Sequence, residues 1–212
     1  MALRWPDSPV GRLLRGLPRH YGTPAPPQFD GPFEMILWEI VAYLADDVRR
    51  GKAFTALQEK VGFQPEQILA APKRLLSEIT RAGGSIAADE RADRLRNAAQ
   101  LVVDGFGGDL GRVLKLAPQK SKKLLMQFPM IGEPGAEILL FSGVAAVLAL
   151  QSNGVRVLIR FGIGEARKSY AATYKSIREA TLEQLPEDGR LLTAAHLLLR
   201  RHRIVSTERA CL

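Results

Sequence analysis

A turn between two expected helices carries the residues best suited to bind a phosphate group. Residues 128–136 read Phe-Pro-Met-Ile-Gly-Glu-Pro-Gly-Ala, and glycine lets a ligand approach the backbone closely. The first N–H groups of a helix have no partner within it, so a helix that begins after this turn attracts anions. An ordinary connection between two helices is the alternative interpretation. The expected phosphate-binding positions are Ile131, Gly132, Glu133 and Gly135.

A basic helix is expected directly before this turn. Lys120, Lys122 and Lys123 lie on it, where they either face a phosphate or form a solvated surface. The whole chain has 30 Lys and Arg against 22 Asp and Glu, a formal net charge of +8. Such an excess favours a polyanionic partner, nucleic acid ahead of an anionic membrane surface.

Metal and disulfide chemistry have little support in the composition. Cys211 is the one cysteine of the sequence, so the chain can form neither an internal disulfide nor a cysteine-based metal site. The richest apolar stretch, 138–150, is too short to span a bilayer. The N-terminus has no long apolar segment typical of a secretory signal. We expect a cytoplasmic monomer, nucleoid-associated if the protein is bacterial.

The elements that must position these residues are expected to be helices almost throughout. The first 32 residues hold seven of the 13 prolines and predict an extended arm with one short helix around 10–17. After Pro32, apolar residues recur at spacings of three and four, and no segment alternates like a strand. The fold is therefore predicted to be all-α. The expected helices are 33–50, 53–61, 65–71, 73–82, 88–106, 109–116, 120–128, 133–150, 153–161, 169–185 and 189–204.

The order of these motifs resembles the helix-hairpin-helix DNA glycosylase superfamily, and its endonuclease III-like members in particular. Residues 128–136 resemble its Leu-Pro-Gly-(Val/Ile)-Gly hairpin, and 31–34, Gly-Pro-Phe-Glu, resemble its Asn/Asp-Pro-Phe-Glu opening. Residues 148–157 resemble the Val-Asp-Thr-His segment and the Arg-Val that follows it, and 196–202 resemble the last family helix. The resemblance implies two helical domains, 31–145 with the hairpin, and 1–30 plus 146–212.

Departures from the family pattern fall on the positions that carry its chemistry. The catalytic Asp falls on Gln151, whose amide cannot act as a general base. The Schiff-base Lys falls on Pro134, which offers no amine, so lyase chemistry through this position is excluded. The first hairpin glycine falls on Met130, and Arg156 is the expected DNA contact of the next helix. The family's four-cysteine motif has no counterpart here, so no iron–sulfur cofactor is expected.

The resemblance also implies a base pocket on the helix expected over 33–50. Its residues would be Trp38, Tyr43 and Leu44, although the aromatic residues could equally be core. Asp46 and Asp47 are the nearest substitutes for the missing carboxylate, and a solvated helix end is their simpler interpretation.

Three functions are consistent with these residues. The first is a DNA repair protein that binds damaged or mismatched duplex DNA and excises a flipped base as a monofunctional glycosylase. The second is a non-catalytic DNA-binding relative that has lost the catalytic Asp and Lys. The third is a helical protein that binds a ligand other than nucleic acid at the same site.

Overall fold

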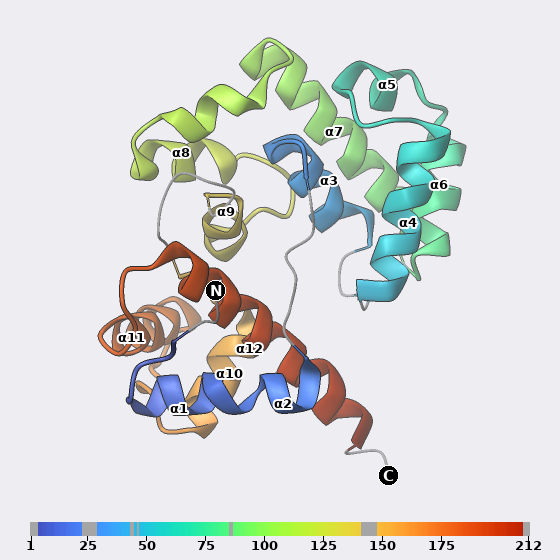
Figure 1. Cartoon of the computed structure of the whole chain (residues 1–212). Coiled ribbons are helices and arrows are strands. Elements are labelled where there is room, and N and C mark those ends of the chain that lie inside the picture. The colour runs from blue at the N-terminus through green and yellow to red at the C-terminus, as the bar shows by residue number, and fades with distance from the viewer. Residues whose placement is uncertain are drawn as a thin grey trace. The chain divides into compact units, whose positions relative to one another are not determined.

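The computed structural model is helical throughout the part of the chain that it describes, which confirms the predicted all-α class (Figure 1). It describes residues 4–22, 29–42, 45, 47–84, 87–140 and 148–209. The chain divides into two compact units, and the sequence placed the boundaries between them at 31 and 145. We call Gln28–Val144 the hairpin unit, and Met1–Pro27 with Ala145–Leu212 the terminal unit.

The hairpin unit is built around its longest helix, α7. Ala92, Leu95, Ala99 and Val102 line the buried side of α7, which packs against α3, α5 and α6. Small alanines on this face let neighbouring helices approach closely, and each fully buried leucine or isoleucine stabilises the unit by about 1.5–3 kcal/mol. The helices are α3 (Pro32–Val41), α4 (Asp47–Lys60), α5 (Pro65–Ala70), α6 (Lys73–Ala82), α7 (Ala88–Phe106), the 3-10 helix η1 (Leu110–Lys115), α8 (Pro118–Leu125) and α9 (Glu133–Leu140).

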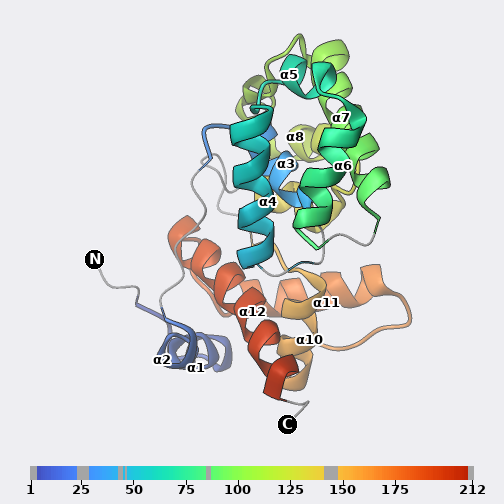
Figure 2. The same ribbon diagram turned by 90° about the vertical axis from the view of Figure 1, so that its right-hand side faces the viewer.

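The terminal unit joins the two ends of the chain. Its helices are α1 (Pro9–Gly16), α2 (Pro18–Tyr21), α10 (Ser152–Arg160), α11 (Tyr170–Leu182) and α12 (Gly189–Arg209), with α10 lying along α12 (Figures 1 and 2). Ser8 caps α1 by accepting the N–H of Gly11 at 3.0 Å, and its hydroxyl donates to the carbonyl of Gln184 at 3.0 Å. The hydroxyl of Tyr21 lies 2.9 Å from Nδ1 of His202. These bonds hold the proline-rich arm against the C-terminal helices.

Three expected helices were wrong in their extent. The helix expected over 133–150 does not reach its end, because residues 148–150 are not helical, and the helix expected over 53–61 is part of α4. The pattern predicted a single helix over 33–50 that stops at Gly51, but α3 ends at Val41 and α4 begins at Asp47 and continues through Gly51. Ala42 leaves the helical region, with φ −149° and ψ 61°, so it breaks a pattern of apolar spacings that continues across it. Gly51 is tolerated inside α4 because a glycine within a helix costs only about 1 kcal/mol.

No helix among the described residues is long and apolar enough to cross a membrane.

Candidate nucleic-acid interface

The connection between α8 and α9, residues 126–132, is a tight hairpin with an exposed tip. Phe128 and Ile131 are 2% and 4% exposed and anchor it in the core of the hairpin unit. The N–H of Ile131 donates to the carbonyl of Phe128 at 3.1 Å and closes the turn. Gly132 is exposed, and its carbonyl accepts the N–H of Ala136 at 2.9 Å to begin α9. The first amides of α9 therefore lie beside a glycine, as a phosphate site requires.

Met130 takes the backbone conformation that a glycine would take more easily. Its φ is 67°, and among the described residues it is the one non-glycine residue with positive φ. Holding a side chain in this region costs about 1–2 kcal/mol. The Sδ atom of Met130 contacts the guanidinium groups of Arg91 and Arg94 on α7. Met130 thus occupies the left-handed region while its side chain packs against α7.

Two hairpin glycines have room for a Cβ atom without a clash. A Cβ atom added to Gly132 would meet only Pro134 Cδ, at 3.8 Å, and one added to Gly135 would lie 3.4 Å from Ile131 Cγ2. Neither position needs glycine for packing within the hairpin unit. Pro134 contributes no N–H, so the donors of this turn come from its neighbours.

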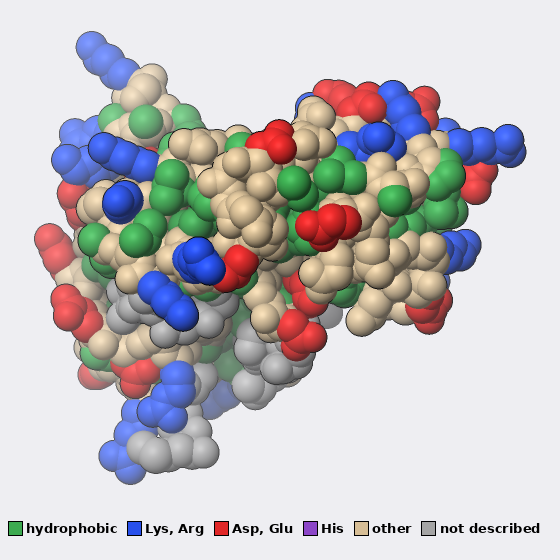
Figure 3. Space-filling view, turned by 90° about the horizontal axis from the view of Figure 1, so that it is seen from above, with side chains coloured by type: hydrophobic (Ala, Val, Ile, Leu, Met, Phe, Trp, Pro, Cys, Tyr) green, Lys and Arg blue, Asp and Glu red, His purple; other side chains and the backbone are tan. Residues whose placement is uncertain are grey.

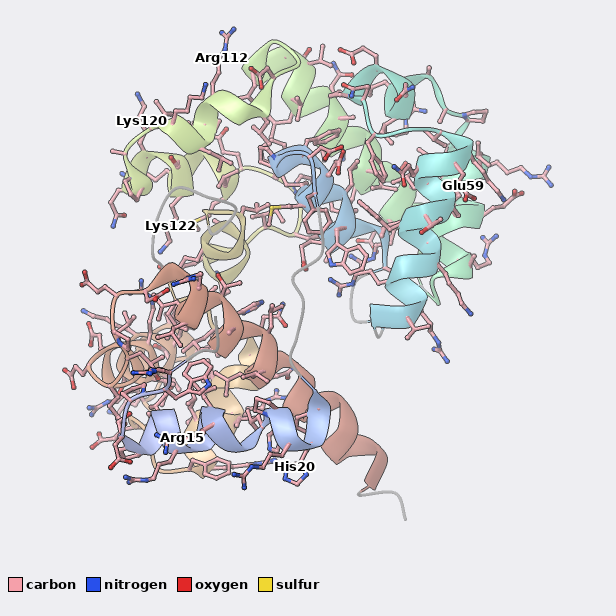
Figure 4. All side chains as sticks on the ribbon, in the orientation of Figure 1. Arg15, His20, Glu59, Arg112, Lys120 and Lys122 are labelled. Carbon is pink, nitrogen blue, oxygen red and sulfur yellow. The ribbon has the colours of Figure 1, made fainter. Side chains whose placement is uncertain are left out.

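The three lysines of α8 differ in exposure, because two face solvent and Lys122 is partly buried. Lys120 and Lys123 are exposed, whereas the ammonium of Lys122 lies 2.9 Å from the carboxylate of Glu137 and also pairs with Glu133 (Figure 4). The side chain of Glu137 is only 3% exposed. Lys122 was expected either to face a phosphate or to lie on a solvated surface, and in the structure its ammonium pairs with these two carboxylates.

The pKa of Lys122 reflects this pairing. Burial by itself disfavours the charged form, but the hydrogen bonds and the negative charges of Glu133 and Glu137 outweigh it and raise the pKa above its ordinary value. The three side chains together carry one net negative charge, because one ammonium faces two carboxylates. A phosphate at this hairpin would therefore rely on backbone amides and on Lys120 and Lys123.

Gln151 begins α10 in the terminal unit. It is the N-cap residue, with φ −73° and ψ 159°, and its carbonyl accepts the N–H of Val155 at 3.1 Å. Its half-buried side chain makes no capping hydrogen bond to α10. Two residues on, Oδ1 of Asn153 is buried and has no hydrogen-bond partner among the described residues.

Two side chains from other helices fix the segment before Gln151. Nε of Arg178 on α11 donates to the carbonyl of Leu148 at 3.3 Å, and Nδ1 of His196 on α12 lies 3.1 Å from the carbonyl of Ala149. A carbonyl only accepts, so Nδ1 of His196 carries a proton. His196 is 5% exposed and is a core residue. No spacing in the sequence pointed to Arg178 in this role.

Arg156 is exposed on α10, one turn beyond Gln151. It forms no ion pair with any described carboxylate, so its charge is available to a partner. Gln151 and Arg156 belong to the terminal unit, whereas the hairpin and the α8 lysines belong to the other unit.

The residues expected to form a base pocket are only partly described. Trp38 is half-buried in an aromatic cluster, with ring centroids 5.9 Å from Phe29 and 5.3 Å from Phe54. The guanidinium of Arg50 lies 5.5 Å from the ring centroid of Trp38 and pairs with the carboxylate of Glu39 at 3.1 Å. Trp38 is thus held rigidly by its neighbours. Tyr43, Leu44, Asp46 and Cys211 lie outside the described residues, as does the side chain of Asp47, the first residue of α4.

Within the described ranges, no group of three or more His, Cys, Asp or Glu side chains could hold a metal ion.

Comparisons with known proteins give matches in structure but not in sequence. No family model and no curated protein matches the chain. A structure of a non-covalent endonuclease III–DNA complex matches with a TM-score of 0.70 and 16% identity, covering 90% of this chain and 82% of that one.

Two further structures extend the comparison. A thermostable thymine-DNA glycosylase matches with a TM-score of 0.65 and 14% identity, covering 91% of this chain and 85% of that one. The H. pylori 3-methyladenine DNA glycosylase bound to 1,N6-ethenoadenine matches with a TM-score of 0.63 and 16% identity, covering 95% of this chain and 96% of that one. The chain therefore has the fold of the helix-hairpin-helix DNA glycosylases.

Proposed function

We propose that the protein is a DNA repair protein that binds damaged duplex DNA and contacts its phosphates through the hairpin. The observation that carries this proposal is the hairpin itself, in which Met130 adopts the left-handed conformation and Gly132 stands exposed at the start of α9. Backbone amides at such a turn bind phosphate without reading the bases. Binding should therefore depend steeply on salt and little on sequence. Structures of the same fold that were determined with DNA support this partner.

We further propose that any base release by this chain is monofunctional. In that reaction water adds to the sugar carbon, the glycosidic bond breaks, and the base leaves with a proton. Pro134 offers no amine for a Schiff base, so the DNA strand would stay intact. Gln151 can position the water by hydrogen bonds but cannot remove its proton. We also propose that the protein works without an iron–sulfur cluster, because the sequence has one cysteine, Cys211.

A second candidate function is supported by Gln151. The family resemblance assigns a carboxylate to this position, and a neutral amide cannot stabilise the positive charge that develops on the sugar as well as a carboxylate does. A non-catalytic relative that recognises damaged or bent DNA without releasing a base is consistent with this substitution. Base release measured on duplexes with oxidised, alkylated, deaminated and mismatched bases separates the two candidates.

The hairpin proposal is tested with Gly132→Ala. The added methyl group fits within the protein but stands where a phosphate would approach, so we expect duplex affinity to fall about tenfold at 0.1 M salt, the loss of roughly one phosphate contact. Fluorescence anisotropy with a labelled duplex gives this affinity. Gly51→Ala is the matched control in the same unit, since nothing lies within 4 Å of the added Cβ atom, and it should bind like the unmodified protein. Equal affinity for Gly132→Ala, or no binding at low salt, would overturn the proposal.

A further inference from the structure

The positive charge of the chain belongs to one of its two units. The hairpin unit holds fifteen Lys and Arg and fifteen Asp and Glu, so its formal net charge is zero. The terminal unit holds fifteen Lys and Arg against seven Asp and Glu, which accounts for the whole +8 of the chain. The unit that carries the hairpin therefore contributes no net attraction to a polyanion, and the other unit supplies all of it.

Both units pair part of their basic residues with carboxylates, and in the terminal unit these are Arg12, Arg167, Lys175 and Arg190. In the hairpin unit, carboxylate partners are present for Arg50, Lys73, Arg74, Arg81, Arg94, Arg112 and Lys122. In the terminal unit, Arg19, Arg156 and Arg160 are exposed and form no ion pair with a described carboxylate. Arg15 donates to the backbone carbonyls of Trp5 and Pro6, both at 3.2 Å, and these carry no net charge.

These four arginines follow one another across neighbouring helices. Arg156 and Arg160 stand one turn apart on the exposed side of α10, with Cβ atoms about 5–6 Å apart. Arg15 and Arg19 have the same spacing on α1 and α2, which Leu17 joins in a helical conformation with φ −61° and ψ −39°. Arg15 and His20 both project from this arm in Figure 4. We call Arg15, Arg19, Arg156 and Arg160 the arginine track.

The two halves of the track meet at His202. Tyr21, at the end of α2, contacts the ring of His202 on α12. Burial lowers the pKa of His202, and the positive charges of Arg160 and His20 lower it further. His202 lies on α12, which contacts the end of α2 through Tyr21 and packs along α10. The end of α10 and the end of α2 thus form one positively charged surface.

We propose that the arginine track binds the phosphate backbone of the duplex that flanks the site at Gln151. This inference rests on the proposed function. Gln151 caps one end of α10 and Arg160 ends the other, about 13 Å away at 1.5 Å per residue, so the track starts near the candidate site and leads away from it. Guanidinium groups bind phosphate oxygens with two parallel hydrogen bonds, which suits them to this task.

Duplex DNA fits the track better than a lipid surface does. A helix that lies on a membrane inserts an exposed apolar face. The apolar side of α1 is already buried, with Val10, Leu14 and Leu17 at most 5% exposed. Phe161, at 55% exposure, is the one large exposed hydrophobic residue next to the track in sequence. The track therefore offers charge and hydrogen-bond donors with little apolar area.

The test uses the full chain with Arg19→Gln and Arg160→Gln together. We expect the slope of log Kd against log salt to fall by about 1.8, since each lost phosphate contact removes about 0.9. At 0.1 M salt this corresponds to a loss of affinity of roughly sixtyfold. The effect should be present on a duplex of 30 base pairs and smaller on one of 10 base pairs. Melting of the free variant checks that α2 still packs against α12.

The matched control removes the same charge elsewhere in the terminal unit. Lys175→Gln with Arg190→Gln changes the net charge equally, at side chains that are 76% and 74% exposed and paired with Glu179 and Asp188. Its salt slope should equal that of the unmodified protein.

Each outcome has a separate meaning. If the track variant binds with an unchanged slope, or the control loses as much, the track does not bind DNA. The proposal is also overturned if the unmodified protein binds vesicles with anionic lipid, the track variant does not, and the track variant binds DNA normally. That result would assign the surface to a membrane. If the unmodified protein binds no duplex at all, the proposed function itself fails.

Discussion

The two units of this protein offer opposite means of holding a polyanion. The hairpin unit holds the turn between α8 and α9 but has no net charge, and carboxylates pair with four of its exposed basic residues, Lys73, Arg74, Arg81 and Arg112. Figure 3 shows basic and acidic side chains intermixed over one face of the molecule. The terminal unit lacks a hairpin but holds the whole charge excess. Shape and charge, usually combined in one basic surface, are divided here between two parts of the chain.

This division has a consequence for binding. Backbone amides give a fixed register on the phosphates, whereas unpaired arginines give long-range attraction that salt weakens. A hairpin that binds without excess charge should position DNA, and the terminal unit should bring DNA to it. The following variants change one unit at a time.

The largest effect is expected from Gln151→Asp in the terminal unit. The carboxylate would stand at the start of α10, where a negative charge is favoured by the helix dipole and can stabilise the developing positive charge of the sugar. We expect base release to rise about a hundredfold or more, which corresponds to roughly 3–4 kcal/mol of the barrier. Release of free base from a damaged duplex, followed under single-turnover conditions, measures it. Borohydride should trap no protein–DNA adduct with either protein.

Gln151→Asn is the control for this variant. Asparagine is as good an N-cap as aspartate and has the same length, but it is neutral. If Asn raises base release as much as Asp, the gain comes from capping and not from charge. If the unmodified protein already releases base at ordinary glycosylase rates and Asp adds nothing, another residue carries the chemistry, with Asp46 and Asp47 tested first.

The next largest effect is expected from Lys122→Met in the hairpin unit. Without the ammonium, the buried carboxylate of Glu137 loses a charged partner, and breaking a buried pair in this way costs about 3 kcal/mol. Urea unfolding measures the loss, with Trp5→Phe as background so that Trp38 reports on the hairpin unit alone. Lys120→Met, an exposed lysine of the same helix, should change stability by less than about 0.5 kcal/mol.

A double variant that replaces both partners of the ion pair with apolar residues completes this test. Lys122→Met with Glu137→Leu should recover most of the lost stability, because the buried carboxylate is then removed together with its ammonium partner. Failure of the second change to help would mean that Glu137 is held by groups other than Lys122.

The sequence predicted the helical class and the position of the hairpin because both depend on local patterns. Apolar spacing indicates a buried helix face, and Gly and Pro mark the turns. Met130 has a positive φ at the position where the pattern has a glycine, and the buried Phe128 and Ile131 lie on either side of it in the sequence.

The partners of the site residues could not be predicted in the same way. In the sequence, Lys122 is one of three lysines that look equivalent. Only the packing of α8 against α9 shows that Lys122 faces Glu133 and Glu137. The break between α3 and α4 was missed because apolar residues continue through Ala42 with helical spacing. The charge partition is present in the sequence, but it becomes visible only once the chain is divided into its two units.

The smallest effect is expected from pH, and it concerns the positive end of the terminal unit. His202 has a folded pKa below 6.5 because of burial and the charges of Arg160 and His20. Between that lowered pKa and 6.5, the unfolded chain binds the proton more readily than the folded one, so stability falls as pH decreases through this window and is fully present above it. We expect the melting temperature to drop by about 1–2 °C between pH 7 and pH 5.5 because of this group.

His202→Gln keeps a polar partner for Tyr21 and should flatten this part of the pH profile. Arg160→Gln removes one of the two neighbouring charges and should raise the pKa of His202, as measured by NMR titration of the ring. An unchanged pKa in that variant would mean that Arg160 does not lie near His202, and it would separate the two halves of the arginine track.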